Sequence, residues 1–86
     1  PDGRSDLYAL GMTLYELCAL QPAFNETDKT RLIASVRERT PPSPQNLNGR
    51  CPAHLSQIIM QLIAKRPDDR FQSADDLMRA LLEFLR

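Results

Sequence analysis

Residues 5–20 constrain the fold most, because they predict a helix with almost no polar face. Leucines recur at every third or fourth position from Leu7 to Leu17, and Tyr8, Met12 and Tyr15 lie on another side of the same helix. A helix that is apolar nearly all round must be covered by other elements, and 86 residues can hardly surround it completely. The sequence therefore predicts a helix that belongs to the middle of a larger body.

Three further segments have helical periodicity, and no segment alternates apolar and polar residues as a strand does. Residues 29–39 carry a narrow apolar face, and residues 52–63 start with a proline that costs no hydrogen bond and end before Pro67. The last helix starts at Ser73, with an acidic residue three positions on, and runs to Leu85. We predict one all-α domain over residues 1–86, in which residues 40–50 form an extended, proline-rich loop.

Composition and charge argue against several classes of protein. The chain has 11 basic and 11 acidic residues, so it lacks the positive field with which nucleic-acid binders and anionic-membrane binders attract their partners. No apolar run approaches the roughly 20 residues that span a bilayer. Cys18 and Cys51 are too few for a disulfide framework and have no metal-ligand spacing with His54. We expect a soluble, cytoplasmic protein that binds neither nucleic acid nor membrane.

A search for catalytic chemistry finds no candidate within the sequence. The three glycines are scattered, so no glycine-rich loop can hold phosphates. His54 has no carboxylate or nucleophile partner in the sequence around it, which favours a surface histidine at the start of a helix. We therefore predict no catalytic residue, no metal site and no cofactor site in these residues.

Two motifs nevertheless match a known family. Residues 4–17, Arg-Ser-Asp-Leu-Tyr-Ala-Leu-Gly-Met-Thr-Leu-Tyr-Glu-Leu, followed by Pro22-Ala23-Phe24, resemble the central F helix of eukaryotic-like Ser/Thr protein kinases and its following turn. Residues 62–74, Leu-Ile-Ala-Lys-Arg-Pro-Asp-Asp-Arg-Phe-Gln-Ser-Ala, resemble the segment between the last two large helices, with Arg70 at the characteristic arginine. Tyr8 is typical of the bacterial branch. The resemblance spans the chain and implies a four-helix portion of the kinase C-terminal lobe, helices F to I.

The resemblance implies structural roles for two charged residues. The carboxylate matching Asp6 accepts hydrogen bonds from the catalytic loop in the family, whereas the residues alone favour Asp6 or Ser5 as a helix N-cap; both roles can hold at once. Arg70 would form a buried ion pair with the glutamate of the family's Ala-Pro-Glu motif, which lies outside this sequence. Without that glutamate, the alternative is a solvated arginine paired with Asp68 or Asp69.

Thr13 and Leu17 match positions of the F helix that support apolar stacks inside the family's fold. Thr13 departs from the usual aliphatic residue, but its hydroxyl can bond to a carbonyl of its own helix. Leu20 stands where a glycine with positive φ commonly ends this helix. We expect a small loss of packing at Thr13, no loss of function, and an unsettled turn before Pro22.

The parent chain implied by the resemblance is a Ser/Thr protein kinase that transfers the γ-phosphate of ATP to protein serine or threonine in signalling. ATP and Mg²⁺ are expected for the parent alone, because the nucleotide-binding and catalytic motifs of the family are missing from this sequence. We expect the 86 residues to be inactive alone and to serve as scaffold and docking surface. Their expected partners are the N-terminal remainder of the kinase domain and, along the segment from Lys29 to Arg39, protein substrates or regulators.

Three alternatives accompany this hypothesis. A non-catalytic, pseudokinase-like interaction module shares every residue, and upstream sequence alone separates it from an active kinase. A DNA-binding bundle would need a basic recognition helix, whereas the last helix begins with Asp75 and Asp76, which repel phosphates. The charged residues between Arg31 and Arg39 are also compatible with an ordinary solvated face.

Overall fold

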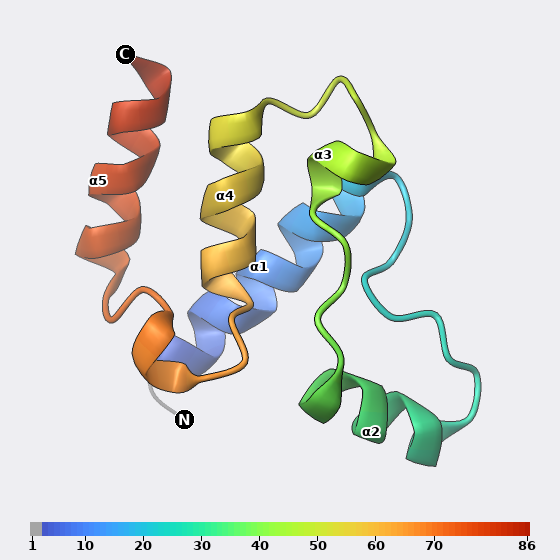
Figure 1. Cartoon of the computed structure of the whole chain (residues 1–86). Coiled ribbons are helices and arrows are strands. Elements are labelled where there is room, and N and C mark those ends of the chain that lie inside the picture. The colour runs from blue at the N-terminus through green and yellow to red at the C-terminus, as the bar shows by residue number, and fades with distance from the viewer. Residues whose placement is uncertain (1–2) are drawn as a thin grey trace.

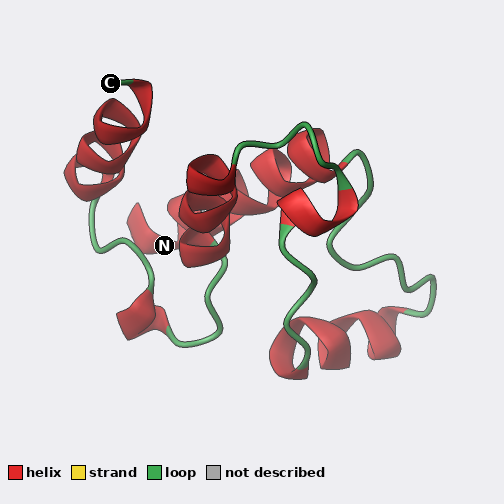
Figure 2. Cartoon of the chain, turned by 45° about the horizontal axis from the view of Figure 1, so that its top comes forward, coloured by secondary structure: helices red, strands yellow, loops and turns green. Residues whose placement is uncertain are grey.

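The computed structural model describes residues 3–86, and every regular element in that range is helical (Figure 2), which confirms the predicted all-α fold. None of the described helices is both long enough and apolar enough to cross a membrane. The elements, in chain order, are α1 (Gly3–Ala19), α2 (Lys29–Glu38), α3 (Pro44–Leu47), α4 (Ala53–Leu62), the 3₁₀ turn η1 (Pro67–Asp69) and α5 (Ala74–Leu85).

The helices form a thin slab built around α1 and α4. Helix α4 packs across α1, α5 packs on the other side of α4, and α3 lies against both α1 and α4 (Figure 1). Helix α2 stands apart from these helices at the end of two loops. The Cα positions extend over 41 × 33 × 16 Å, so the shortest dimension holds about two layers of packed helices. A slab this thin covers α1 on one side only.

The core lies where α1 and α4 cross. One stripe of α1, at four-residue spacing, faces α4, because residues i and i+4 share a helix face. Gly11 belongs to this stripe and allows the two helices to approach closely, since a Cβ atom there would lie 2.6 Å from Cβ of Leu62. The buried apolar side chains of this core are Leu7, Tyr15, Ala19, Ile58, Ile59, Leu62, Ile63, Phe71 and Leu77.

The opposite side of α1 is open. Leu10 is 40% exposed, Leu17 is 65% exposed and Leu20 is 76% exposed. This exposure confirms the expectation that the chain does not surround its apolar helix. Helix α4 packs along the stripe through Leu7 and Tyr15 and leaves Leu10 and Leu17 uncovered, so the row of leucines does not define the buried face.

Two local predictions also need correction. Helix α1 begins at Gly3, so Ser5 and Asp6 lie within its first turn and not at an N-cap before it. The proline-rich segment contains α3, where Pro44 occupies the first turn and its carbonyl accepts a hydrogen bond from the Asn48 amide at 2.9 Å. Proline is well suited to a first helical turn, so its presence did not exclude a helix there.

The hydroxyl of Tyr15 donates to the carbonyl of Pro42 and attaches this proline-rich segment to α1.

Leu20 follows the last residue of α1 with φ of 65°, the left-handed conformation that favours glycine at the end of a helix. Because this conformation costs a non-glycine residue about 1 to 2 kcal/mol, and the Leu20 side chain buries little surface, Leu20→Gly should stabilise the chain. The greater freedom of glycine in the unfolded chain offsets part of the gain, which leaves about 0.5 to 1 kcal/mol, or about 4 °C in Tm. Calorimetry checks this shift. Leu20→Ala retains Cβ and should show no gain; a lower Tm for the glycine variant would contradict the prediction.

Candidate functional site

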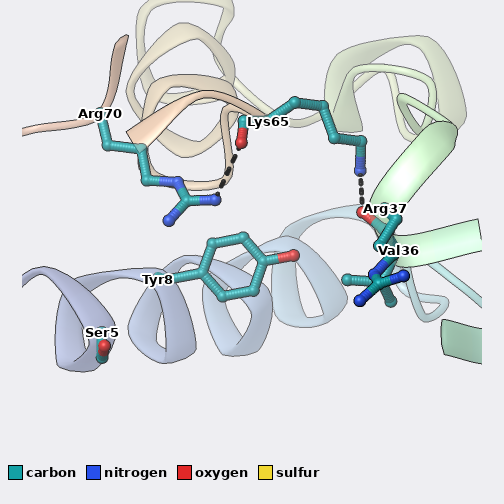
Figure 3. Close-up of a pocket in the computed structure, with 6 residues that line it drawn as sticks. All are labelled: Ser5, Tyr8, Val36, Arg37, Lys65 and Arg70. Carbon is teal, nitrogen blue, oxygen red and sulfur yellow. Dashed lines mark hydrogen bonds between the residues drawn. The ribbon is translucent and has the colours of Figure 1, made fainter. Parts of the chain in front are cut away.

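A cationic pocket lies between the first half of α1, the end of α2 and the connection from α4 to η1. Its volume is about 400 Å³. Three cationic side chains and no carboxylate are among the described residues that line it, so its electrostatic character suits an anion. The lining residues, drawn in Figure 3, are Ser5, Tyr8, Val36, Arg37, Lys65 and Arg70.

Arg70 is held in this cationic pocket by backbone carbonyls. Its Nε donates to the carbonyl of Ala64 at 2.6 Å, and one terminal nitrogen donates to the carbonyl of Lys65 at 3.2 Å. The guanidinium carbon lies 4.6 Å from the centre of the Tyr8 ring, within the range of a cation–π interaction (Figure 3). A guanidinium has five N–H donors. The donors that remain make no hydrogen bond to a described residue and form a fixed fork.

The pairing of Arg70 with a neighbouring aspartate, considered from the sequence, does not occur. Asp68 and Asp69 are exposed on η1, and neither forms an ion pair with Arg70 in the part of the chain that the structure describes. The two carbonyls accept hydrogen bonds from two of the guanidinium nitrogens, but a neutral carbonyl carries no charge that could balance that of the arginine. Arg70 therefore keeps further N–H donors, and a planar guanidinium of this kind can bind a carboxylate through two hydrogen bonds.

Lys65 connects the separate helix α2 to the turn that carries Arg70. Its Nζ donates to the carbonyl of Val36 near the end of α2 at 2.7 Å and lies 4.8 Å from the centre of the Phe24 ring. Burial of the ammonium, and then the nearby charge of Arg70, lower the pKa of Lys65. The side chain of Lys65 thus reaches α2, while its carbonyl holds Arg70.

Lys65→Met should loosen α2 and leave the α1–α4 core intact. Methionine preserves most of the apolar stem but removes the hydrogen bond to Val36 and the cation–π contact with Phe24. The amides of α2 should then exchange with solvent about tenfold faster, which corresponds to the loss of about 1.4 kcal/mol. Hydrogen exchange followed by mass spectrometry measures this change. Lys29→Met, at the exposed start of α2, is the matched control; unchanged exchange in the Lys65 variant would refute the connection.

The other predicted site residues lie together on the open side of α1. Asp6, Thr13 and Leu17 are separated by seven and four residues, so they share one helix face with Leu10. We call these four residues the exposed face of α1. The Asp6 carboxylate is exposed and makes no hydrogen bond to a described residue. The Thr13 hydroxyl donates to the carbonyl of Ala9 at 3.2 Å, as predicted.

The structure therefore separates the predicted residues into two groups. The exposed face of α1 gathers three of them, whereas Arg70 lies apart in the cationic pocket. Sequence reasoning missed Lys65 and the role of the Tyr8 ring. Tyr8 was predicted to lie on an apolar side of its helix and was noted as typical of the bacterial branch, but no local pattern links it with an arginine so far along the chain.

Comparison with known proteins agrees with the resemblance. No protein-family model matches the chain. The chain is 42% identical over 83 residues to "Hybrid signal transduction histidine kinase G" of Dictyostelium discoideum, a match that covers 96% of the chain and 2% of that protein. It is 35% identical over 80 residues to "Serine/threonine-protein kinase Pkn1" of Myxococcus xanthus, covering 93% of the chain and 12% of the relative.

A third relative is the "DNA damage-responsive serine/threonine-protein kinase RqkA" of Deinococcus radiodurans, 41% identical over 73 residues, with 84% of the chain and 11% of the relative covered. The chain spans at most 12% of the length of these three relatives. Its helices α1, α2, α4 and α5 follow the order that the resemblance implies for helices F, G, H and I. The chain belongs to the eukaryotic-like Ser/Thr protein kinase family, bacterial type, and constitutes a portion of its C-terminal lobe.

Proposed function

We propose that this chain is the scaffold and docking part of a Ser/Thr protein kinase, whose parent chain transfers the γ-phosphate of ATP to protein serine or threonine. The cationic pocket is the observation that carries this proposal. Arg70 is held there by two carbonyls and by Tyr8, and it lines the pocket together with Lys65 and Arg37. The glutamate of the family's Ala-Pro-Glu motif supplies a carboxylate of the right geometry, and its binding would fix the end of the activation segment.

The exposed face of α1 is the second contact with the N-terminal remainder of the kinase domain. The Asp6 carboxylate is free to accept hydrogen bonds from the backbone of the catalytic loop. Leu17 and the neighbouring Thr13 offer a surface on which the apolar stacks of the lobe can pack. Such packing would remove the exposed side chain of Leu17 from water. One helix thus contacts the core on one side and would carry the catalytic loop on the other.

The proposal places ATP and Mg²⁺ on the upstream part of the parent. No group of three histidine, cysteine, aspartate or glutamate side chains among the described residues could hold a metal ion. The two cysteines are free thiols, which is the usual state of cysteines in the cytoplasm, and the parent's substrate ATP is abundant there. We therefore place the kinase domain in the cytoplasm. In this proposal, the 86 residues position other residues of the parent and do not act on substrate.

Helix α2 is the docking surface in this proposal. It stands apart from the other helices, and Ile33 is 50% exposed in the middle of it. Arg37 lies four residues after Ile33 and shares its helix face, whereas Arg31 lies on the other side of α2; Arg39 pairs with Glu26 at 3.3 Å. An exposed aliphatic side chain beside Arg37 fits protein substrates or regulators with an acidic and apolar surface.

The parent gene tests the proposal. We expect the frame upstream of Pro1 to encode the glycine-rich loop, the phosphate-binding lysine and the His-Arg-Asp, Asp-Phe-Gly and Ala-Pro-Glu motifs. An upstream frame without those residues would favour the pseudokinase-like interaction module instead.

Asp6→Asn in the purified parent should lower kcat for phosphoryl transfer about tenfold, because an amide is a poorer anchor for the backbone of the catalytic loop. Transfer of labelled phosphate from ATP to a generic protein substrate measures it, and KM for ATP should change little. Asp75→Asn, exposed in the first turn of α5, is the matched control. Equal activity of the two variants would remove Asp6 from the proposed role.

A further inference from the structure

Two cysteines that are far apart in the sequence meet at one end of α1. Cys18 lies in the last turn of α1, and Cys51 lies just before α4. Asn48 contacts both: its side-chain amide donates to the carbonyl of Cys18 at 2.8 Å, and its own carbonyl accepts from the backbone amide of Cys51 at 3.0 Å. A single residue thus fixes the backbone at both cysteines, and the proposed kinase scaffold makes no use of either thiol.

The Cys18 side chain lies close enough to affect the Cys51 thiol, which itself contacts the carbonyl of Pro52 at 3.7 Å. Cys51 is buried and Cys18 is partly exposed. Burial raises the pKa of the Cys51 thiol, and the adjacent Cys18 sulfur, which shares a side-chain hydrogen bond with it, raises it further. A disulfide needs two cysteines whose side chains meet on backbone that is already in place, and the contacts of Asn48 with both cysteines supply such a backbone.

We propose that Cys18 and Cys51 form a reversible disulfide and that this pair is an oxidation site for small-molecule disulfides such as oxidised glutathione. The accessible Cys18 sulfur attacks the glutathione disulfide and releases one glutathione as a thiol. The Cys51 sulfur then attacks the mixed disulfide at the Cys18 sulfur and displaces the second glutathione. Two protein thiols are oxidised, one glutathione disulfide is reduced, and both protons pass to the released glutathione thiols.

The bond would close a loop that contains α2 and the proline-rich segment. Both ends of this loop are already held by Asn48, so the disulfide would restrain the unfolded chain without rearranging the folded one. The oxidised chain should therefore melt at a temperature about 10 °C higher than the reduced chain. The predicted rise in melting temperature depends only on where the two cysteines lie, so we expect it whether or not the parent is an active kinase.

A redox titration of the 86-residue chain tests the proposal. The chain is equilibrated with reduced and oxidised glutathione at several ratios and quenched with acid. Mass spectrometry then measures the fractions of reduced chain, internal disulfide and mixed disulfide. Trypsin should release peptides 5–29 and 51–65 joined by a disulfide. The equilibrium constant for disulfide formation in native buffer should exceed that in concentrated urea at least about tenfold, because the fold holds the thiols together.

Three variants serve as controls for the internal disulfide. Cys18→Ser and Cys51→Ser should each give only the mixed disulfide with glutathione. Asn48→Ala retains both thiols but loses the side-chain hydrogen bond to Cys18, so its equilibrium constant should fall toward the value in urea. Equal constants in native buffer and urea would overturn the proposal. Two mixed disulfides on one chain, or linkage between chains in place of the internal bond, would also overturn it.

Discussion

Gly11→Ala is expected to lower the free energy of unfolding of the chain by about 2 kcal/mol and its Tm by about 10 °C. The added Cβ would lie 2.6 Å from Cβ of Leu62 and 2.8 Å from a methyl carbon of Ile63. A Cβ atom cannot move without its backbone, so α4 would have to shift away from α1. Overpacking of this kind costs about 3 kcal/mol, and the better helix propensity of alanine returns about 1 kcal/mol.

Urea denaturation of the variant measures this loss, and the chain offers two matched controls. Gly3 and Gly49 have open space where a Cβ would stand, and neither has a positive φ. Gly3→Ala and Gly49→Ala should therefore be as stable as the original chain or slightly more stable. If Gly11→Ala were as stable as these controls, the close contact between α1 and α4 would not exist.

The sequence predicted the helices better than their contacts. Regular apolar spacing located α4 and α5 because each has one clearly apolar face. Helix α1 is apolar on both faces, so periodicity could not show which face meets α4 or that Leu10 and Leu17 would be exposed. The short helix α3 was missed because proline favours both a loop and a first helical turn.

The residues of the candidate site were even harder to predict from the sequence, because they meet through contacts between distant positions. Asp6 and Arg70 were identified through the family resemblance, since alone each is an ordinary charged residue near a turn. Lys65 was not identified, because its significance comes from Val36 and Phe24, which lie far away in the sequence. The proximity of the two cysteines was invisible for the same reason: their spacing matches no motif, and a single asparagine brings them together.

Arg70→Ala in the parent kinase is expected to lower stability by about 3 to 5 kcal/mol and phosphoryl transfer by about a hundredfold. Removal of the guanidinium would leave the partner glutamate buried without a counter-charge, which is the main energetic cost. The end of the activation segment would then lose its anchor, and the residues that it positions would lose their alignment. Thermal unfolding and transfer of labelled phosphate measure the two effects, with Arg79→Ala, exposed on α5, as the control.

The same substitution in the 86-residue chain should cost only about 1 to 2 kcal/mol. There Arg70 loses two hydrogen bonds to carbonyls and one contact with Tyr8, and no buried carboxylate is left behind. Arg70→Lys should behave much like the alanine variant in the parent, because an ammonium retains the charge but cannot form the bidentate pair. A larger loss in the parent than in the 86-residue chain would be the signature of the proposed ion pair. Equal losses in both chains would show that Arg70 supports its own turn and nothing beyond it.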